Sequence, residues 1–348
     1  MKFFEKLLNP FQIAIRQSVE TFINLETADD EHTLAAKDGS LVSYVRVDGS
    51  KQIIGDQEYE HIVKAATLKV GSRFDRPGHA LQIFFVRDPG RIEDELGRLV
   101  RPSRTTSRAI GLEIDDLFQE RIRHLTKYLS YEECYFVLWT RPSILTKAEI
   151  ERVSKNSKNK GKEWVNAPHA QNPFAALKEL RTRHKSLVSS VLTGLEEIGI
   201  STELMEVHDA LAAVRGNLYP KKANEKWRAC LPGDPIPPRA PTSVTDMSDI
   251  LWPPLRQQLA VGDSRVIDDK VVQLGDLIWA GADIVLAPMD PSPFPQLLNR
   301  LFDAKVPYRM SFLIEGGGAQ SMAFQTMMST LFGVTNAMNK QIKYALEG

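Results

Sequence analysis

The chain has 348 residues, of which 44 are Lys or Arg and 44 are Asp or Glu, so its formal charge at neutral pH is zero. A hydrophobic content of 43% can fill real cores, which excludes global disorder, collagen-like repeats and a disulfide-stapled mini-protein. The lack of a basic excess argues against a dedicated nucleic-acid binder, and two cysteines are too few for a disulfide framework or a zinc cluster.

Two local features of the sequence indicate where in the cell the protein works. Cys134 begins an apolar run over residues 134–139, which indicates a buried, reduced thiol and fits the cytoplasm. No stretch of 18 uncharged apolar residues occurs, as a membrane-spanning helix would need. We therefore expect any contact with a membrane to be peripheral.

Residues 3–25 carry apolar side chains at helical spacing and predict an amphipathic helix with a break at Pro10. The ordinary interpretation is a helix that packs on the chain's own domain. The alternative is a docking site that inserts into a bilayer surface or a partner's groove. As a hypothesis, this site consists of Phe3, Phe4, Leu7 and Leu8.

The next segment contains two Asp-Gly pairs, Asp38-Gly39 and Asp48-Gly49, around a strand-like run. Since Asp-Gly favours two-residue hairpin turns, a three-strand meander over residues 33–54 is predicted. A helix is expected over 56–74, followed by a buried strand over 79–87. The helix should point Ile62, Val63, Ala66 and Val70 inward.

A helical pattern then covers residues 91–128, with interruptions near Pro102 and Gly111, and a strong strand follows over 131–140. Two helices between two strands predict a split α/β arrangement in a single sheet. The arginine-rich piece Arg101–Arg108 could bind phosphate, but the acidic residues on both sides favour a solvated loop.

Residues 154–172 are polar, rich in Lys and Asn, and have no apolar period, so they predict a flexible linker or loop. A nucleic-acid patch is the alternative, but four lysines without an extended basic face do not support it. The linker divides the chain into an N-terminal α+β subdomain over residues 1–153 and a second α+β subdomain over 173–348.

In the second subdomain, a long helix over 173–198 should end at Gly199. A proline-rich arm over 219–256 cannot be regular structure. The other expected elements are strands over 201–207, 265–267, 271–274, 282–287 and 308–314, and helices over 208–218, 295–304 and from 320 onward. The predicted fold class is therefore α+β, with two mixed α/β halves that each hold a short-strand sheet, and a proline-rich arm.

The sequence motifs indicate no catalytic, cofactor-binding or metal-binding residue. The only Gly-Lys pair, Gly161-Lys162, is followed by Glu163 rather than Ser or Thr, so there is no Walker A motif. The glycines at 316–318 follow Glu315 and lack a nearby lysine, which favours a permissive turn over a phosphate site.

The seven histidines show no metal-binding spacing. His124 and His184 lie on polar helix faces, where a solvated ring is expected. His208-Asp209 is too common a pair to indicate a catalytic dyad. On this evidence the chain is not an enzyme by itself, and we expect it neither to bind nor to hydrolyse ATP.

Several segments together resemble the N-terminal region of the large cytoplasmic ATPases of type IV secretion and conjugation systems (the TrbE/CagE class). The resemblance is closest to the DotO/IcmB-type ATPases of Dot/Icm, or type IVB, secretion systems. The similar segments are residues 38–42 (DGSLV), 45–49 (VRVDG), 117–121 (LFQER), the strand 135–140 and the proline-rich 231–235 (LPGDP).

The resemblance implies a non-catalytic assembly and docking region at the cytoplasmic face of the inner membrane. Implied partners are inner-membrane channel components and other ATPases of the same system, with homo-oligomers of the full-length protein and no nucleic acid. A motor domain that uses ATP and magnesium would lie downstream of Gly348.

Two other classes remain open. A stand-alone enzyme of unrecognised class would need a cleft of perturbed carboxylates or histidines. A free-standing adaptor could use Phe3, Phe4 and the proline-rich arm as docking surfaces.

Overall fold

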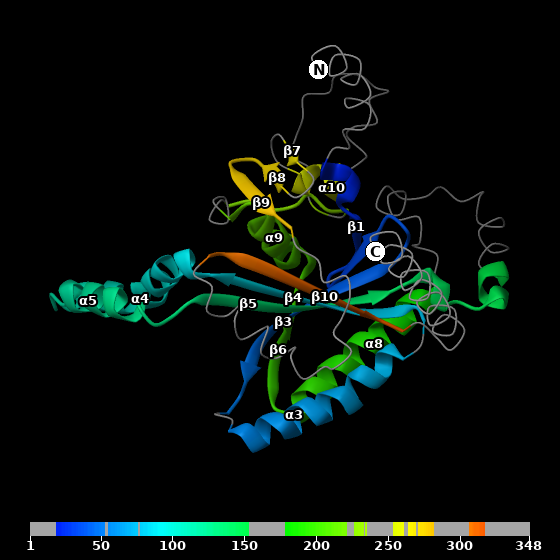
Figure 1. Cartoon of the computed structure of the whole chain (residues 1–348), viewed down its shortest axis with the longest axis horizontal. Coiled ribbons are helices and arrows are strands. Elements are labelled where there is room, and N and C mark those ends of the chain that lie inside the picture. Colours follow the sequence, from blue (N-terminus) through cyan, green and yellow to red (C-terminus); the bar gives the residue numbers. More distant parts are fainter. Residues whose placement is uncertain are drawn as a thin grey trace, which may run out of the picture.

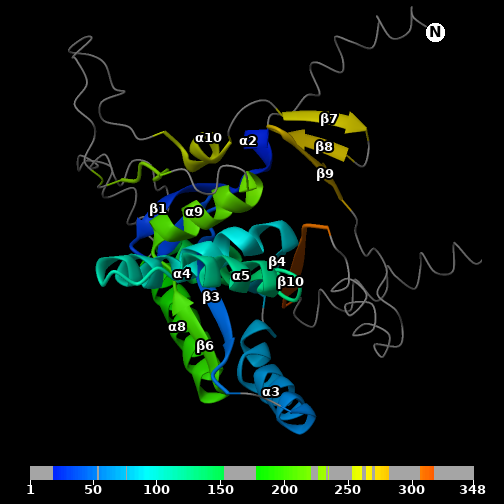
Figure 2. The same cartoon turned by 90° about the vertical axis from the view of Figure 1, so that its left-hand side faces the viewer.

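The computed structural model describes a central seven-stranded sheet with helices on both faces (Figures 1 and 2). The described residues are 19–52, 55–75, 77–152, 178–220, 226–232, 234, 253–260, 264–268, 271–281 and 306–316. The strand order is β1-β2-β3-β5-β4-β10, and β6 pairs with the far end of β3. All of these pairs are antiparallel.

The N-terminal meander consists of β1 (Leu25–Asp30), β2 (Thr33–Ala36) and β3 (Leu41–Ser50), after the short α2 (Val19–Phe22). Asp38-Gly39 forms the predicted turn, with Gly39 at φ 82°. Asp48-Gly49 does not form a turn, and that prediction is wrong. It lies inside β3 as a bulge opposite β6 (Ile200–Leu204), because β6 continues the pairing beyond it.

Beside β3 lies the pair β5 (Tyr131–Thr140) and β4 (His79–Asp88), which matches the predicted split α/β arrangement. The two strands pair along their whole length, from His79 opposite Thr140 to Asp88 opposite Tyr131. Between them the chain forms α4 (Ile92–Ala109) and α5 (Asp115–Leu125), which project beyond the sheet (Figure 1).

One face of the sheet is covered by α3 (Asp56–Lys69) and α8 (Lys178–Glu197). The apolar side chains of α8 pack on side chains that β3, β4 and β5 point toward this face, namely Val45, Leu81 and Leu138. Val70 completes this core as predicted, but Val63 is exposed because it lies on the solvent side of α3.

The opposite face is covered by α9 (Val207–Leu218) and α10 (Leu255–Leu259). Here the complementary set of sheet side chains, such as Val42 and Val137, packs against Leu211, Leu255 and Leu259. Residues 226–231 of the proline-rich arm contain no helix or strand, yet Ala229 and Leu231 are buried in this core.

A separate three-stranded antiparallel sheet follows, made of β7 (Ser264–Asp268), β8 (Val271–Leu274) and β9 (Leu277–Ala280). The last described strand, β10 (Tyr308–Glu315), returns to the main sheet and pairs with β4.

The α+β class is confirmed, but the expectation of a separate sheet in each half is wrong for two strands. Both β6 and β10 belong to the predicted second half, and both pair with strands of the first half. Their long-range pairing places the two halves around one sheet. The predicted linker 154–172, the strand 282–287 and the helices 295–304 and 320 onward lie outside the described residues.

Candidate functional site

The most distinctive surface feature is the helical hairpin of α4 and α5, here called the arm (residues 92–129). It lies between two strands that already pair directly down to Asp88 and Tyr131, so the sheet does not need it for closure. Figure 1 shows the arm extending away from the helices that cover the sheet. An element that adds little to the core and projects into solvent is a candidate for binding.

The arm has a defined internal structure. Leu96, Ser107 and Ile122 are its buried side chains. Across the tip, the Asp115 carboxylate accepts hydrogen bonds from the Nε atoms of Arg104 and Arg108 at 3.2 and 3.1 Å. The pKa of Asp115 is lowered, chiefly by its hydrogen bond with Arg108. These contacts fix α5 against α4.

The prediction of a solvated loop at Arg101–Arg108 is wrong, because this segment is helical and continuous with the rest of α4. Pro102 lies inside α4 and costs it one backbone hydrogen bond without ending it. The predicted interruption at Gly111 is confirmed, since Gly111 has a φ of 71° in the turn between the two helices.

The surface of the arm carries several exposed apolar side chains. Of the sixteen large apolar side chains that are exposed in the described part of the chain, six lie on the arm. These are Leu99, Ile110, Leu112, Leu117, Tyr128 and Leu129. Where exposed apolar groups gather into a patch, they often mark an interaction surface.

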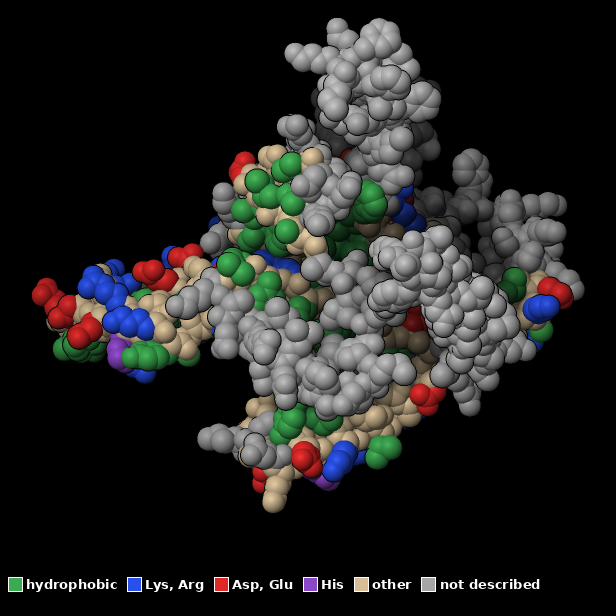
Figure 3. Space-filling model, in the orientation of Figure 1, with side chains coloured by type: hydrophobic (Ala, Val, Ile, Leu, Met, Phe, Trp, Pro, Cys, Tyr) green, Lys and Arg blue, Asp and Glu red, His purple; other side chains and the backbone are tan. Residues whose placement is uncertain are grey.

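On the outer side of α5, apolar and charged groups alternate. Leu117 and Tyr128 are 57% and 73% exposed, and the rings of His124 and Tyr128 lie 5.2 Å apart. A shallow cavity of about 410 Å³ lies on this side, lined by Leu117, Glu120, Arg121, Arg123, His124 and Lys127. Figure 3 shows acidic, basic and apolar side chains mixed along the arm, with apolar ones on its lower edge.

The root of the arm is anchored by a polar cluster on β4, β5 and β10. The guanidinium of Arg91 lies 4.1 Å from the centre of the Tyr131 ring, and the Tyr131 hydroxyl donates to Glu133. Arg309 of β10 lies 3.9 Å from Asp88 and 5.3 Å from the Trp279 ring. Burial lowers the pKa of Arg309. The arm is therefore held at its base by the sheet.

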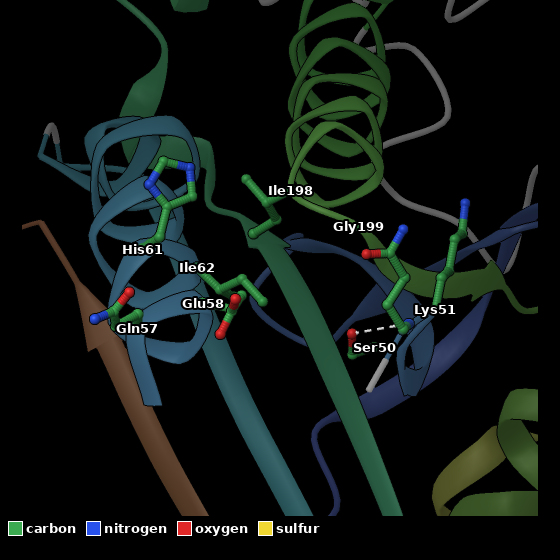
Figure 4. A pocket seen from close by; sticks show the side chains of 9 residues that line it. Ser50, Lys51, Gln57, Glu58, His61, Ile62, Ile198 and Gly199 are labelled. Atoms are coloured by element: carbon green, nitrogen blue, oxygen red, sulfur yellow. Dashed lines mark hydrogen bonds between the residues drawn. The ribbon is translucent and has the colours of Figure 1, made fainter. Parts of the chain in front are cut away.

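A second concave region lies at the start of α3 (Figure 4). Its volume is about 440 Å³, and α3 forms one wall while the end of β3 and the turn between α8 and β6 form the other. Glu58 already occupies the helix N-terminus, where its carboxylate accepts a hydrogen bond from the Gly55 amide at 3.1 Å. The open, mixed lining indicates no defined ligand.

The third polar feature is buried beneath α8. His184 is 1% exposed, and its Nε2 and Nδ1 lie 2.9 Å from Ser43 Oγ and 2.9 Å from Thr140 Oγ1. Ser43 Oγ donates to the His32 carbonyl oxygen at 2.7 Å, so it accepts from Nε2, and Nδ1 of the neutral ring accepts from Thr140. Burial lowers the pKa of His184 to about 4.

The prediction of a solvated His184 is thus wrong, while His124 is exposed as expected. A Ser–His pair sealed inside the core cannot reach a substrate, so this network is structural. His208 lies 3.3 Å from Asp234 of the proline-rich arm and not in a dyad with Asp209. Sequence reasoning had no signal for either contact, because both partners are distant in the chain.

The remaining predicted positions are the docking residues near the N-terminus, the glycine turn after β10 and Cys134. Phe3, Phe4, Leu7 and Leu8 lie outside the described residues, as do Gly317 and Gly318. Glu315 forms an ion pair with Arg141 at 2.9 Å. Cys134 is a free, half-buried thiol, and burial raises its pKa to about 11.

Within the described ranges, no group of three or more His, Cys, Asp or Glu side chains could hold a metal ion. In the same residues, no helix is both long and apolar enough to cross a membrane.

Comparison with protein-family models and with curated proteins gave no match to this chain.

Proposed function

We propose that this chain is an assembly and docking module whose contact surface is the arm. The observation that carries the proposal is a group of six exposed apolar side chains on a projecting element that the sheet does not need. Exposed apolar side chains lower the solubility of a protein unless a partner covers them. The contact between Arg91 and Tyr131 at the base of the arm holds it in one orientation for binding.

The resemblance described above gives this module a context. In our proposal it is the N-terminal region of a cytoplasmic type IV secretion ATPase, peripheral to the inner membrane. Its partners would be channel components and other ATPases of that system, and ATP with magnesium would belong to a motor downstream of Gly348. Phe3, Phe4, Leu7 and Leu8 remain a second docking hypothesis.

The arm can be removed with little change to the sheet, which makes a direct test possible. Replacing residues 89–130 by Asn-Gly would connect β4 to β5 through a two-residue turn of the type that adjacent antiparallel strands favour. We expect this variant to keep a cooperative thermal transition, because both cores lie on the body. We expect it to lose co-purification with the membrane fraction.

A matched control removes exposed apolar groups elsewhere. Tyr59 and Leu68 on α3 are 59% and 74% exposed. The variant Tyr59→Ser/Leu68→Ser should behave like the unmodified chain in both measurements. Full membrane recovery of the folded chain that lacks the arm would contradict the proposal.

A further inference from the structure

We infer that the outer side of α5 binds the same surface of a second copy of this chain, with the two helices antiparallel. This inference rests on the proposed function, since it adds one partner of the arm, a second copy of the chain, to the channel components. Four charged residues carry it: Asp116, Glu120, Arg123 and Lys127, spaced at i, i+4, i+7 and i+11. Such spacing places them in one stripe along a helix.

The order of charge along this stripe is polarised. The two carboxylates stand toward the N-terminal end of α5, and the two cations stand toward and just past its C-terminal end. All four side chains are exposed, and none forms an ion pair with another described residue. Within the described part of the chain, the one acidic residue of α5 with an ion-pair partner is Asp115, which binds Arg104 and Arg108 on the side that faces α4.

When two copies are related by a two-fold axis, the acidic end of the stripe on one copy faces the basic end of the stripe on the other. In an antiparallel pair centred between Arg121 and Ile122, Asp116 of one copy meets Lys127 of the other, and Glu120 meets Arg123. Because such an interface is isologous, each of these pairs occurs twice. A parallel arrangement would instead place like charges together, so the stripe selects one orientation.

The apolar groups follow the same geometry. Leu117 and His124 on α5 and Tyr128 in the turn just after it are spaced at i, i+7 and i+11, and all three are exposed. In the antiparallel pair, Leu117 of one copy lies between His124 and Tyr128 of the other. The shallow cavity on this side, which Leu117 and His124 help to line, leaves room for that packing. Charge sets the register, and apolar burial supplies the affinity.

The test is sedimentation velocity of the full chain over a concentration series at low salt. We expect a reversible monomer–dimer equilibrium that weakens as salt rises, because the paired charges are at the surface. Two variants reverse one half of the stripe each: Asp116→Lys/Glu120→Lys and Arg123→Glu/Lys127→Glu. Each alone should weaken self-association about tenfold or more, since each creates like-charge contacts.

Mixing the two variants is the decisive step. One is then basic along the whole stripe and the other acidic, so a heterodimer should form about as tightly as the unmodified dimer. The control Lys51→Glu/Lys64→Glu changes the net charge as the second variant does, at exposed positions off the arm, and should leave the dimer unchanged. Circular dichroism and melting curves establish that each variant is folded.

A monomeric unmodified chain at the highest concentration would overturn the inference, as would folded variants that do not associate when mixed. The proposed function fails separately, through retained membrane co-purification of the chain without its arm. A monomer that still needs the arm for co-purification would therefore leave the proposed function standing and remove this inference alone.

Discussion

At the residue scale, the most informative side chain is His184, because its burial reverses what its neighbours in the sequence indicate. Arg183 and Lys185 flank it, yet α8 turns the imidazole inward onto Ser43 and Thr140. Both hydroxyls come from strands that pack beneath α8. The fold therefore contains a neutral histidine whose hydrogen bonds are all internal.

This arrangement predicts acid sensitivity. The pKa of His184 is lowered from 6.5 to about 4 by burial, so the unfolded chain binds a proton that the folded chain does not. The contribution of His184 to the free energy of unfolding is therefore fully present above pH 6.5. As the pH falls from 6.5 toward 4, the free energy of unfolding decreases by about 1.4 kcal/mol for each pH unit. The pKa of His79 is also lowered by burial and acts in the same direction.

Chemical denaturation at a series of pH values measures this slope. The variant His184→Gln should be less stable at pH 7 but should lose much of the pH dependence between 6.5 and 4. The variant His124→Gln changes an exposed ring and should leave the curve as it is. An unchanged slope in His184→Gln would show that other groups produce the acid sensitivity.

Two neighbouring ion pairs on α8 allow a second comparison. Arg181 donates two hydrogen bonds of 2.7 Å to Asp29, whose side chain is only 2% exposed. Lys185 lies 3.1 Å from Asp30 but is 68% exposed. Arg181→Ala should cost about 2–3 kcal/mol because it removes two charge-assisted hydrogen bonds from a buried carboxylate, whereas Lys185→Ala should cost less than about 1 kcal/mol. Equal losses in urea unfolding would contradict this ranking.

At the scale of elements, two glycines with positive φ test how the strands are shaped. Gly49 has a φ of 107° and open space around its Cα, while Gly78 has a φ of 102° and lies against Ile144. A Cβ on Gly78 would approach the Ile144 Cβ to 2.6 Å. Gly49→Ala should therefore cost about 1–2 kcal/mol of strain, and Gly78→Ala about 3 kcal/mol or more from strain and overpacking.

Thermal unfolding of the two variants gives the comparison directly. A larger loss for Gly49→Ala than for Gly78→Ala would show that the bulge, and not the packing before β4, is the tighter constraint.

The local pattern was enough to predict where several elements begin and end, even where their partners are distant. The bounds of β5 and β8 match the predicted 131–140 and 271–274, and Gly199 ends α8 with a φ of 80°. Which strands pair with one another was misjudged. The Asp48-Gly49 bulge depends on β6, about 150 residues later, and β10 finds its partner β4 across more than 200 residues.

At the scale of the whole molecule, the sequence predicted the two helices of the arm but not their role. Helical periodicity identifies which side chains share a face, but it does not say whether the rest of the fold covers that face. Leu117 and Tyr128 are exposed on an element that leaves the sheet where β4 and β5 stop pairing, at Asp88 and Tyr131. The exposure of the candidate site therefore depends on how the strands of the sheet are connected, which local sequence patterns do not give.

The central claim is that the protein meets its partners through the arm, and site-specific photo-crosslinking in intact cells tests it most directly. A photoreactive amino acid would replace Leu117 or Tyr128 on the arm, and Leu68 or Tyr59 on α3 as positions of comparable exposure. We predict strong protein adducts from both arm positions and weak or no adducts from both α3 positions. Equal labelling from the two helices, or labelling from α3 alone, would contradict the assignment of the arm as the contact surface.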